Sequence, residues 1–370
     1  MKLHIPTGLL TLVISAMSLA AATDYTFDSN KKIGDLTDVG EINIWGSNVE
    51  IDSVNGGNGV TVYCFSQRDI YTPGGPAPEV ITEYPATLKV NSNLVLDYCM
   101  VQGISSSNVA TIIADEVTTT GKAVFSNANV QALKGNITIS GKLYDDGYIA
   151  YSSLTNTDLI AEKGSVNIGG YLNMSGGNIS AANSVNITNS TVTVSGLSAQ
   201  QVNINAGGEL NLDECRVELG EIAVGADASL GINGAILVFN EDSAITLSEG
   251  ATLTAFNNVS FEFILDTDSI SGSGVEYSFD IFKGIDNLTD ADSLAIIDNF
   301  EQAVEAGEIA ITLKGMTAEG EMIELDANSA SVSFKDGSFS IKGTDSVPEP
   351  TTATLSLLAL AALAARRRRR

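Results

Sequence analysis

The stretch SVNIGGYLNMSGGNISAANSVNITNSTVTVSGLSAQQVNIN, residues 165–205, decides the fold. Apolar and polar residues alternate in short runs, and glycine, asparagine or serine stands between the runs. Alternation with a period of two is typical of a β-strand that buries one face, while glycine and asparagine supply the backbone conformations of tight corners. The stretch therefore predicts several short strands joined by turns.

The pattern recurs on both sides of this stretch. Runs of the form V-x-I begin at intervals of 17 to 29 residues, and a second series of the form L-x-L follows them. The first series begins at Val117, Ile137, Val166, Val185, Val202 and Ile222, and the second at Leu143, Leu172, Leu210 and Leu230. Imperfect repeats of this length indicate a stacked solenoid whose inward residues form apolar ladders. The longest interval predicts an extra loop at YDDGYIAYSS, residues 144–153.

These repeats predict an all-β fold, mostly a parallel β-helix (β-solenoid) over residues 101–258. A less regular, strand-rich N-terminal cap is expected over residues 23–100, and a small α+β capping module over residues 259–343. The end coil of a solenoid needs a cover against edge-to-edge pairing, which is the reason to expect caps. A β-sandwich is the alternative, because it too has regularly spaced strands.

One helix is expected, in TDADSLAIIDNFEQAVEAG at residues 289–307. Thr289 or Asp290 can cap its N-terminus, and Gly307 can end it. Its buried face is predicted from helical spacing and comprises Leu294, Ile297, Phe300 and Val304.

The composition restricts the chemistry that the protein can perform. The only histidine is His4, which lies within the signal peptide expected at residues 1–22, so we expect a mature chain without histidine-based catalysis or histidine metal sites. Lys2 and the five terminal arginines lie in segments that we expect to be removed during export. Without them, 13 of the 19 lysines and arginines remain against 45 acidic residues, which gives a formal charge of −32. Such a surface repels nucleic acid, and we expect no nucleic-acid partner.

The first 22 residues read as a secretory signal peptide. Lys2 precedes an apolar stretch, and the small residues Ala20 and Ala22 are those that a signal peptidase recognises. We expect cleavage before Thr23. In an oxidising compartment Cys64 and Cys99 could then form a disulfide if one enlarged coil separates them; buried free cysteines are the alternative.

The chain ends in VPEPTTATLSLLALAALAARRRRR, residues 347–370. The uncharged run of residues 351–365 would reach about 22 Å as a helix, against a bilayer core of about 30 Å, so it is short for a permanent span. Five cations follow it and would stay on the cytoplasmic side, namely Arg366, Arg367, Arg368, Arg369 and Arg370. The segment therefore suits a temporary membrane anchor; an ordinary, unprocessed anchor is the alternative.

Together, Pro348, Glu349 and Pro350, the apolar run and the arginines resemble the PEP-CTERM sorting signal of Gram-negative bacteria. The resemblance covers residues 344–370 and not the body of the chain. It implies a membrane-embedded exosortase as processing partner. It also implies export through an inner-membrane intermediate to the cell surface or an extracellular polysaccharide matrix.

An enzymatic reading rests on paired carboxylates, which glycoside hydrolysis requires, or on a basic residue, Arg216, of the kind that β-helix lyases use. The candidate carboxylates are Asp145, Asp146, Asp158, Asp213 and Glu214. Acidic loops beginning at Asp266 and Asp286 could bind calcium, but neither matches an established calcium motif. Because no convergent reactive cluster is evident, we expect no catalytic residue, no metal and no cofactor.

A group of tyrosines, Tyr144, Tyr148, Tyr151 and Tyr171, has two readings: an aromatic platform for sugar, or packing of loop and strand. The function expected overall is that of a structural or adhesive surface protein, with extracellular polysaccharide as a possible partner. A secreted β-helix polysaccharide lyase or glycoside hydrolase is the alternative.

Overall fold

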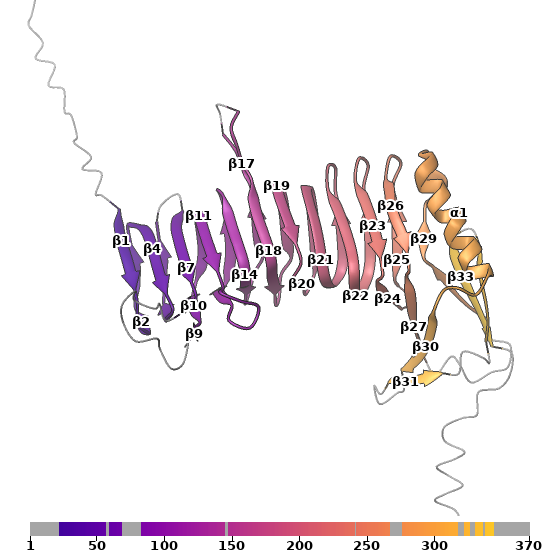
Figure 1. The fold of residues 1–370 in the computed structure, drawn as a ribbon, viewed down its shortest axis with the longest axis horizontal. Helices are drawn as coiled ribbons and strands as arrows, with labels where there is room; N and C mark the ends of the chain where they lie inside the picture. Colours follow the sequence, from indigo (N-terminus) through magenta and orange to yellow (C-terminus); the bar gives the residue numbers. More distant parts are fainter. Residues whose placement is uncertain are drawn as a thin grey trace, which may run out of the picture.

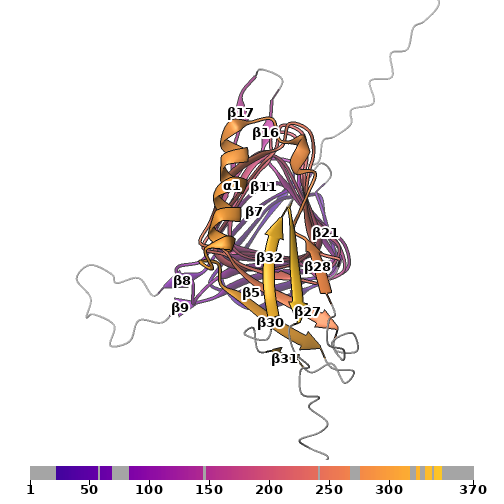
Figure 2. The ribbon, with the colours of Figure 1, turned by 90° about the vertical axis from the view of Figure 1, so that its right-hand side faces the viewer.

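The computed structural model describes residues 22–56, 59–68, 83–144, 147–240, 242–266, 276–316, 322–325, 330–335 and 337–343. It is a β-solenoid of about 11 turns, which confirms the predicted all-β, parallel architecture. Figure 1 shows the coils following one another along a single axis, with the helix and a few strands at the C-terminal end. Seen along that axis, the strands surround a three-sided core (Figure 2).

Each coil contributes a strand, or part of one, to each of three parallel faces. The first face contains β1 (Thr23–Phe27), β4 (Val39–Trp45), β7 (Val60–Phe65), β11 (Asn93–Gln102), β14 (Ala123–Ala132), β18 (Ser152–Ala161), β19 (Val166–Ser175), β21 (Ser184–Ile204), β22 (Glu209–Val224), β23 (Ser229–Asn233) and β26 (Thr252–Asn257).

The longest of these strands turn corners and also serve the other faces. The second face adds β2 (Lys31–Ile33), β5 (Asn48–Ile51), β10 (Ala86–Val90), β12 (Ala110–Ala114), β20 (Asn178–Ala181), β24 (Ile236–Phe239), β27 (Ser260–Asp266) and β30 (Ile311–Met316). The third face adds β3 (Leu36–Thr37), β6 (Val54–Asn55), β13 (Glu116–Thr119), β15 (Ile137–Ser140), β25 (Ala244–Leu247) and β29 (Phe282–Lys283).

Apolar ladders fill the space between the faces. Val117, Ile137, Val166 and Val185 are register partners in succession, as are Val202 and Ile222, and all are buried. This is the ladder that the V-x-I series predicts. The second face has a still longer one, formed by Val49, Leu88, Ile112, Val130, Leu159, Ile179, Leu197, Val217, Leu237 and Phe261. Burial of apolar area at every coil stabilises the stack.

The second predicted series is right in part. Leu210 and Leu230 are register partners on the first face, and Leu172 is also buried there. Leu143 is 54% exposed, because it belongs to an antiparallel hairpin of β16 (Lys142–Leu143) and β17 (Ile149–Ala150). This hairpin is the extra loop that the long interval predicts, and it projects from the side of the solenoid (Figure 1).

Corners between faces use left-handed backbone at stacked positions. Between the first and second faces, Asn127, Asn156 and Glu214 have φ of 45°, 46° and 47°, and Asn156 donates to Asn127 across the coils at 3.4 Å. Asparagine tolerates this conformation better than most residues, which explains its recurrence between the runs.

The parallel stack begins earlier than the predicted boundary at residue 101. β1 pairs with β4, β4 with β7, and β7 with β11, so residues 23–100 contain regular coils rather than a separate cap. One coil is enlarged by a segment between β8 (Gln67–Arg68) and β9 (Glu83–Tyr84), which form an antiparallel pair. The enlargement obscures the period in the sequence.

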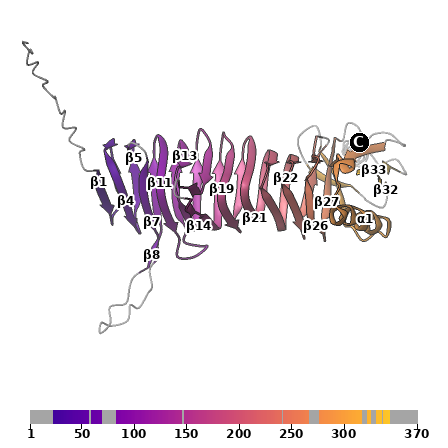
Figure 3. The same cartoon turned by 90° about the horizontal axis from the view of Figure 1, so that it is seen from above.

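The C-terminal end carries the expected small helix and strands. β27 and β30 still stack in parallel, whereas β31 (Met322–Leu325) turns back antiparallel on β30. Three antiparallel strands, β28 (Glu276–Asp280), β33 (Ser338–Gly343) and β32 (Ala330–Lys335), form a separate sheet. A 3-10 turn, η2 (Ile285–Asn287), leads to α1 (Ala291–Glu305). Figure 3 shows α1 and β32 across the end of the stack.

Helix α1 forms where it is predicted, but only two of its four predicted buried residues are fully buried, since Val304 is half-buried against the core. Asp290 is the N-cap, and its carboxylate accepts from the Ser293 backbone N–H at 2.8 Å. Ile297 and Phe300 are buried, but Leu294 is 39% exposed. Ser293 lies on the buried side instead, because its hydroxyl bonds to the backbone of Leu253 in the last coil.

Candidate functional site

The residues of the two predicted export signals lie mostly outside the described residues. This holds for Ala20 at one end, and for Pro348, Glu349, Pro350 and the arginines Arg366 to Arg370 at the other. Ala22 is exposed, and Thr23 begins β1 with its N–H donating to the Asp38 carbonyl at 2.7 Å. The predicted cleavage point therefore falls directly before the first strand of the solenoid. Within the described part of the chain, no helix has the length and apolar character needed to cross a membrane.

The cysteines are buried free thiols in the structure. Cys64 and Cys99 do lie on neighbouring coils, because the enlarged coil separates them. The register, however, pairs Cys64 with Val101 and Cys99 with Val62, so the two cysteines are offset by two residues along the strand. A diagonal offset of this kind exceeds the usual Cα separation of a disulfide, so the structure agrees with the alternative of buried free cysteines. Burial raises the pKa of Cys64 to about 12 and that of Cys215 to about 11.

The candidate carboxylates that the structure describes lie on different coils, Asp158 on β18 and the neighbours Asp213 and Glu214 on β22. Asp158 accepts from Asn178 of the next coil, through backbone N–H at 2.9 Å and side chain at 2.8 Å. Asp213 accepts from Asn233 at 3.0 Å, again one coil on. Glu214 occupies a left-handed corner. Asp145 and Asp146 lie outside the described residues. The contacts of Asp158 with Asn178 and of Asp213 with Asn233 each connect one coil to the next on the surface of the solenoid.

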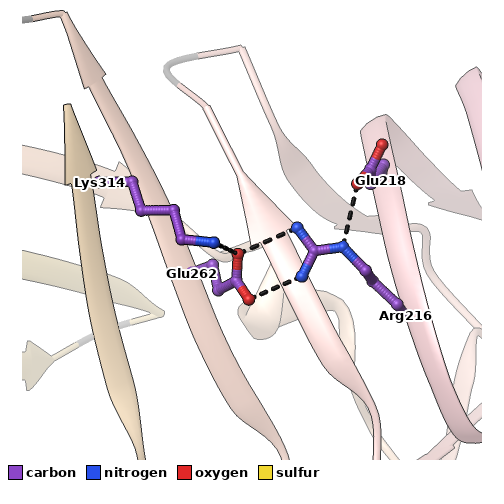
Figure 4. Close-up of polar contacts among 4 residues, drawn as sticks. All are labelled: Arg216, Glu218, Glu262 and Lys314. Carbon is purple, nitrogen blue, oxygen red and sulfur yellow. Dashed lines mark hydrogen bonds and ion pairs between the residues drawn. The ribbon is translucent and has the colours of Figure 1, made fainter. Parts of the chain in front are cut away.

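Arg216 belongs to an ion-pair network on the outer side of the second face, near the C-terminal end (Figure 4). Its guanidinium binds both oxygens of Glu262, at 2.6 and 3.0 Å, and its Nε donates to Glu218 at 3.0 Å. Lys314 donates to Glu262 at 2.6 Å. β22, β27 and β30 supply these residues, so the network crosses several strands. A bidentate arginine–carboxylate pair is strong and geometrically specific, and here it connects the coils to the cap.

Glu262 is the shared carboxylate of this network, and the two cations beside it stabilise its charged form. Hydrogen bonds from Arg216, and to a lesser degree from Lys314, lower the pKa of Glu262 to about 2. Only 14% of its side chain is exposed, while Glu218 is 58% exposed. Because the folded-state pKa is depressed, the stabilisation is fully present above pH 4.5 and is lost as the pH falls toward 2.

Glu262→Gln should lower the free energy of unfolding by about 1–3 kcal/mol at pH 7, since a hydrogen-bonded charge is removed from two cations. The difference from wild type should shrink between pH 4.5 and 2, measured by denaturant unfolding at several pH values. Glu218→Gln is the matched control and should cost about 0.5 kcal/mol or less. A constant difference for Glu262→Gln down to pH 2 would contradict the assignment.

The acidic loop that begins at Asp286 contains the N-cap of α1. This N-cap is Asp290, whose pKa is lowered by hydrogen bonds from the Ser293 hydroxyl and backbone N–H. The acidic loop after Asp266 lies outside the described residues. In the part of the chain that the structure describes, no group of three or more His, Cys, Asp or Glu residues could hold a metal ion.

The outer surface of the solenoid is organised in polar ladders. On the third face Asn167, Asn186 and Asn203 form one of these, with amide-to-amide contacts of 2.7 Å at both steps. Asn167 also donates to Thr138 at 3.2 Å. The sequence predicts polar outward positions, but the identity of the partners depends on coil length and cannot be read from it.

Three of the four tyrosines singled out in the sequence are exposed at the surface. Tyr148 is 63% exposed, Tyr151 59% and Tyr144 41%, while Tyr171 is half-buried. They gather at the base and turn of the β16–β17 hairpin, at the corner between the third and first faces. The rings contact one another in two pairs, Tyr144 with Tyr148 and Tyr151 with Tyr171, and none of them belongs to the apolar core.

Comparison with known proteins identifies the C-terminal tail. A family model described as the PEP-CTERM protein-sorting motif matches residues 346–370, in agreement with the resemblance seen in the sequence. Neither the curated proteins nor the solved structures contain a significant match to the chain. The tail thus carries a sorting motif, while the solenoid is characterised by its own geometry.

Proposed function

We propose that the chain, with its sorting motif at residues 346–370, is a structural or adhesive component of the cell surface or extracellular matrix. The motif implies an exported protein that an exosortase processes. The observation that carries the proposal is the joining of this motif to a long solenoid with polar ladders on its surface, such as Asn167, Asn186 and Asn203. Such a scaffold offers an extended, soluble surface for contacts.

A non-enzymatic role is also part of the proposal. The described acidic groups whose pKa departs clearly from its ordinary value, Glu50, Glu262 and Asp290, all have it lowered. A glycosidase needs a general acid with a raised pKa. Asp158 and Asp213 are bonded to asparagines of the next coil, and Arg216 is held by two glutamates. These contacts support a scaffold.

The sorting step is tested by deleting residues 346–370 in the producing bacterium. The deletion begins after β33, so the solenoid should form, but the protein should be lost from the surface fraction and its export intermediate should not be retained at the membrane. The control is wild-type protein from the same host, whose mature mass should lack residues 1–22 and Arg366 to Arg370.

Two results would contradict the proposed sorting. One is a surface protein whose mass includes all five arginines, which would exclude processing. The other is equal surface retention of the wild type and the deletion variant. Cleavage of a polysaccharide by the purified protein, abolished by substitution of a single carboxylate, would overturn the non-enzymatic role.

A further inference from the structure

The insertion between β15 and β18 concentrates aromatic side chains on the surface. Three of the chain's ten tyrosines lie here, Tyr144, Tyr148 and Tyr151, and Tyr171 of β19 meets Tyr151 from the next coil. Among the described residues, none of the four belongs to the apolar core or packs against it as a half-buried neighbour. Contiguous exposed apolar surface on a soluble protein marks a contact site more often than a packing defect.

The hairpin that carries the cluster is held in place from several sides. Tyr144 donates its backbone N–H to the Tyr148 carbonyl at 2.8 Å, and Gly141 bonds to Gly170 of the next coil. The Lys142 ammonium lies 4.9 Å from the centre of the Tyr144 ring and 3.7 Å from the Asp97 carboxylate. These contacts hold the hairpin and the Tyr144 ring before any ligand arrives, which lowers the entropic cost of binding.

The four rings form two pairs, and neither pair is stacked face to face. Tyr151 and Tyr171 meet edge to face, with centroids 5.9 Å apart and planes at 85°. Tyr144 and Tyr148 are tilted by 39° at a similar separation. In neither pair do the two rings cover each other's faces as in a parallel stack. Each tyrosine combines an apolar ring with a hydroxyl at its tip.

Lys142 and Asp97 lie on the Tyr144 side of the cluster, whereas the strands that continue from Tyr151 and Tyr171 carry polar, uncharged side chains. On the first face, Ser153 is the register partner of Asn173, and Thr155 is the partner of Ser175. All four side chains are exposed. A protein partner would favour an apolar interface centre, whereas hydroxyl and amide groups beside aromatic rings complement the C–H faces and hydroxyls of a sugar. The formal charge of −32 disfavours an anionic ligand.

We propose that the tyrosine cluster, with the serine, threonine and asparagine side chains of β18 and β19 beside it, binds an uncharged polysaccharide. The inference rests on the proposed function and names the ligand class for it. Successive coils are about 4.8 Å apart, a spacing similar to the length of one hexose unit, so an extended glycan can follow the solenoid axis along this face.

The test is affinity electrophoresis of the mature protein. Native gels contain hydroxyethyl cellulose, dextran, alginate or the extracellular polysaccharide of the producing strain. Wild type should be retarded by at least one uncharged polysaccharide and not by alginate. Y148A/Y151A should lose at least about tenfold in affinity, as expected when two exposed aromatic contacts are truncated. The double variant should keep the wild-type unfolding transition, because both rings are outside the core.

Matched variants separate the ring from its surroundings. Tyr84 is 42% exposed and lies in the β8–β9 pair, away from the cluster. The Tyr84→Ala variant should therefore bind like wild type. Y148F/Y151F keeps the rings and should retain most of the affinity. Equal binding by wild type and Y148A/Y151A would show that the tyrosine cluster is not the binding site, while the proposed adhesive function would stand. Retardation of wild type by alginate alone would overturn the proposed ligand class. No retardation of wild type in any gel would overturn the ligand class and would also count against an adhesive function.

Discussion

Phe261→Ala should lower the free energy of unfolding by about 3–5 kcal/mol, because it opens a cavity where the last coils meet the cap. Phe261 is fully buried at the end of the long ladder of the second face. Its ring stacks on Phe263 at 5.7 Å and meets Phe339 edge to face at 5.1 Å. Phe300 of α1 lies 5.8 Å away. The substitution thus removes contacts to coil, helix and terminal sheet together.

The measurement is denaturant unfolding, combined with hydrogen exchange to locate the loss. In a solenoid each coil contacts only its neighbours, so the loss of stability stays local. Protection of backbone amides from hydrogen exchange should therefore fall first in β24, β27 and β30. Phe65→Ala is the control, since Phe65 lies outward on the first face against Trp45, with ring centroids 4.8 Å apart. It should cost about 1 kcal/mol. Similar losses for the two variants would contradict a sealing role for Phe261.

Gly177→Ala should cost roughly 3 kcal/mol or more, which places it in the severe class of substitutions. Gly177 has φ of 85°, and an added Cβ would lie 2.1 Å from the carbonyl oxygen and 2.5 Å from the nitrogen of Thr157, in the preceding coil. Thr157 is fully buried, so its backbone cannot move aside without separating β18 from β20. The expected loss therefore comes from backbone displacement between two coils.

Gly147→Ala provides the matched control. Gly147 has nearly the same φ, 83°, but apart from its chain neighbours no described residue lies within 4 Å of the added Cβ. Only left-handed strain remains, at about 1–2 kcal/mol. Thermal or denaturant unfolding of the two variants therefore separates strain from steric contact. If both lose the same stability, the contact with Thr157 is not the determinant.

The sequence predicts the fold where coil length is nearly constant. Val166 and Val185 are 19 residues apart and are register partners, as the repeat requires. At the N-terminal end the partner of Val62 is Cys99, 37 residues later, because a long segment is inserted into that coil. The period is interrupted there, and regular coils resemble a separate cap. The prediction that Leu143 belongs to a buried ladder is wrong for a similar reason, because the β16–β17 hairpin has an apolar pattern like that of the L-x-L runs.

Contacts between residues far apart in the chain cannot be predicted from the sequence alone. Arg216 stands out as a basic residue among the repeats, but its main partner is Glu262, 46 residues later, and the two meet only because intervening coils have particular lengths. Cys64 and Cys99 miss each other by two residues of register, a shift that spacing alone does not specify. The tyrosines form a group in the sequence, while their exposure depends on the position of the hairpin.

The placement of the cap gives the molecule a direction. The coil that begins at Thr23 is at one end, and the strand that leads toward the sorting motif, β33, is at the other (Figure 1). About 11 turns at about 4.8 Å give a rod of roughly 50 Å. The first coil and the end that leads to the sorting motif are therefore at opposite ends of the rod, and the tyrosine hairpin projects between them (Figure 1).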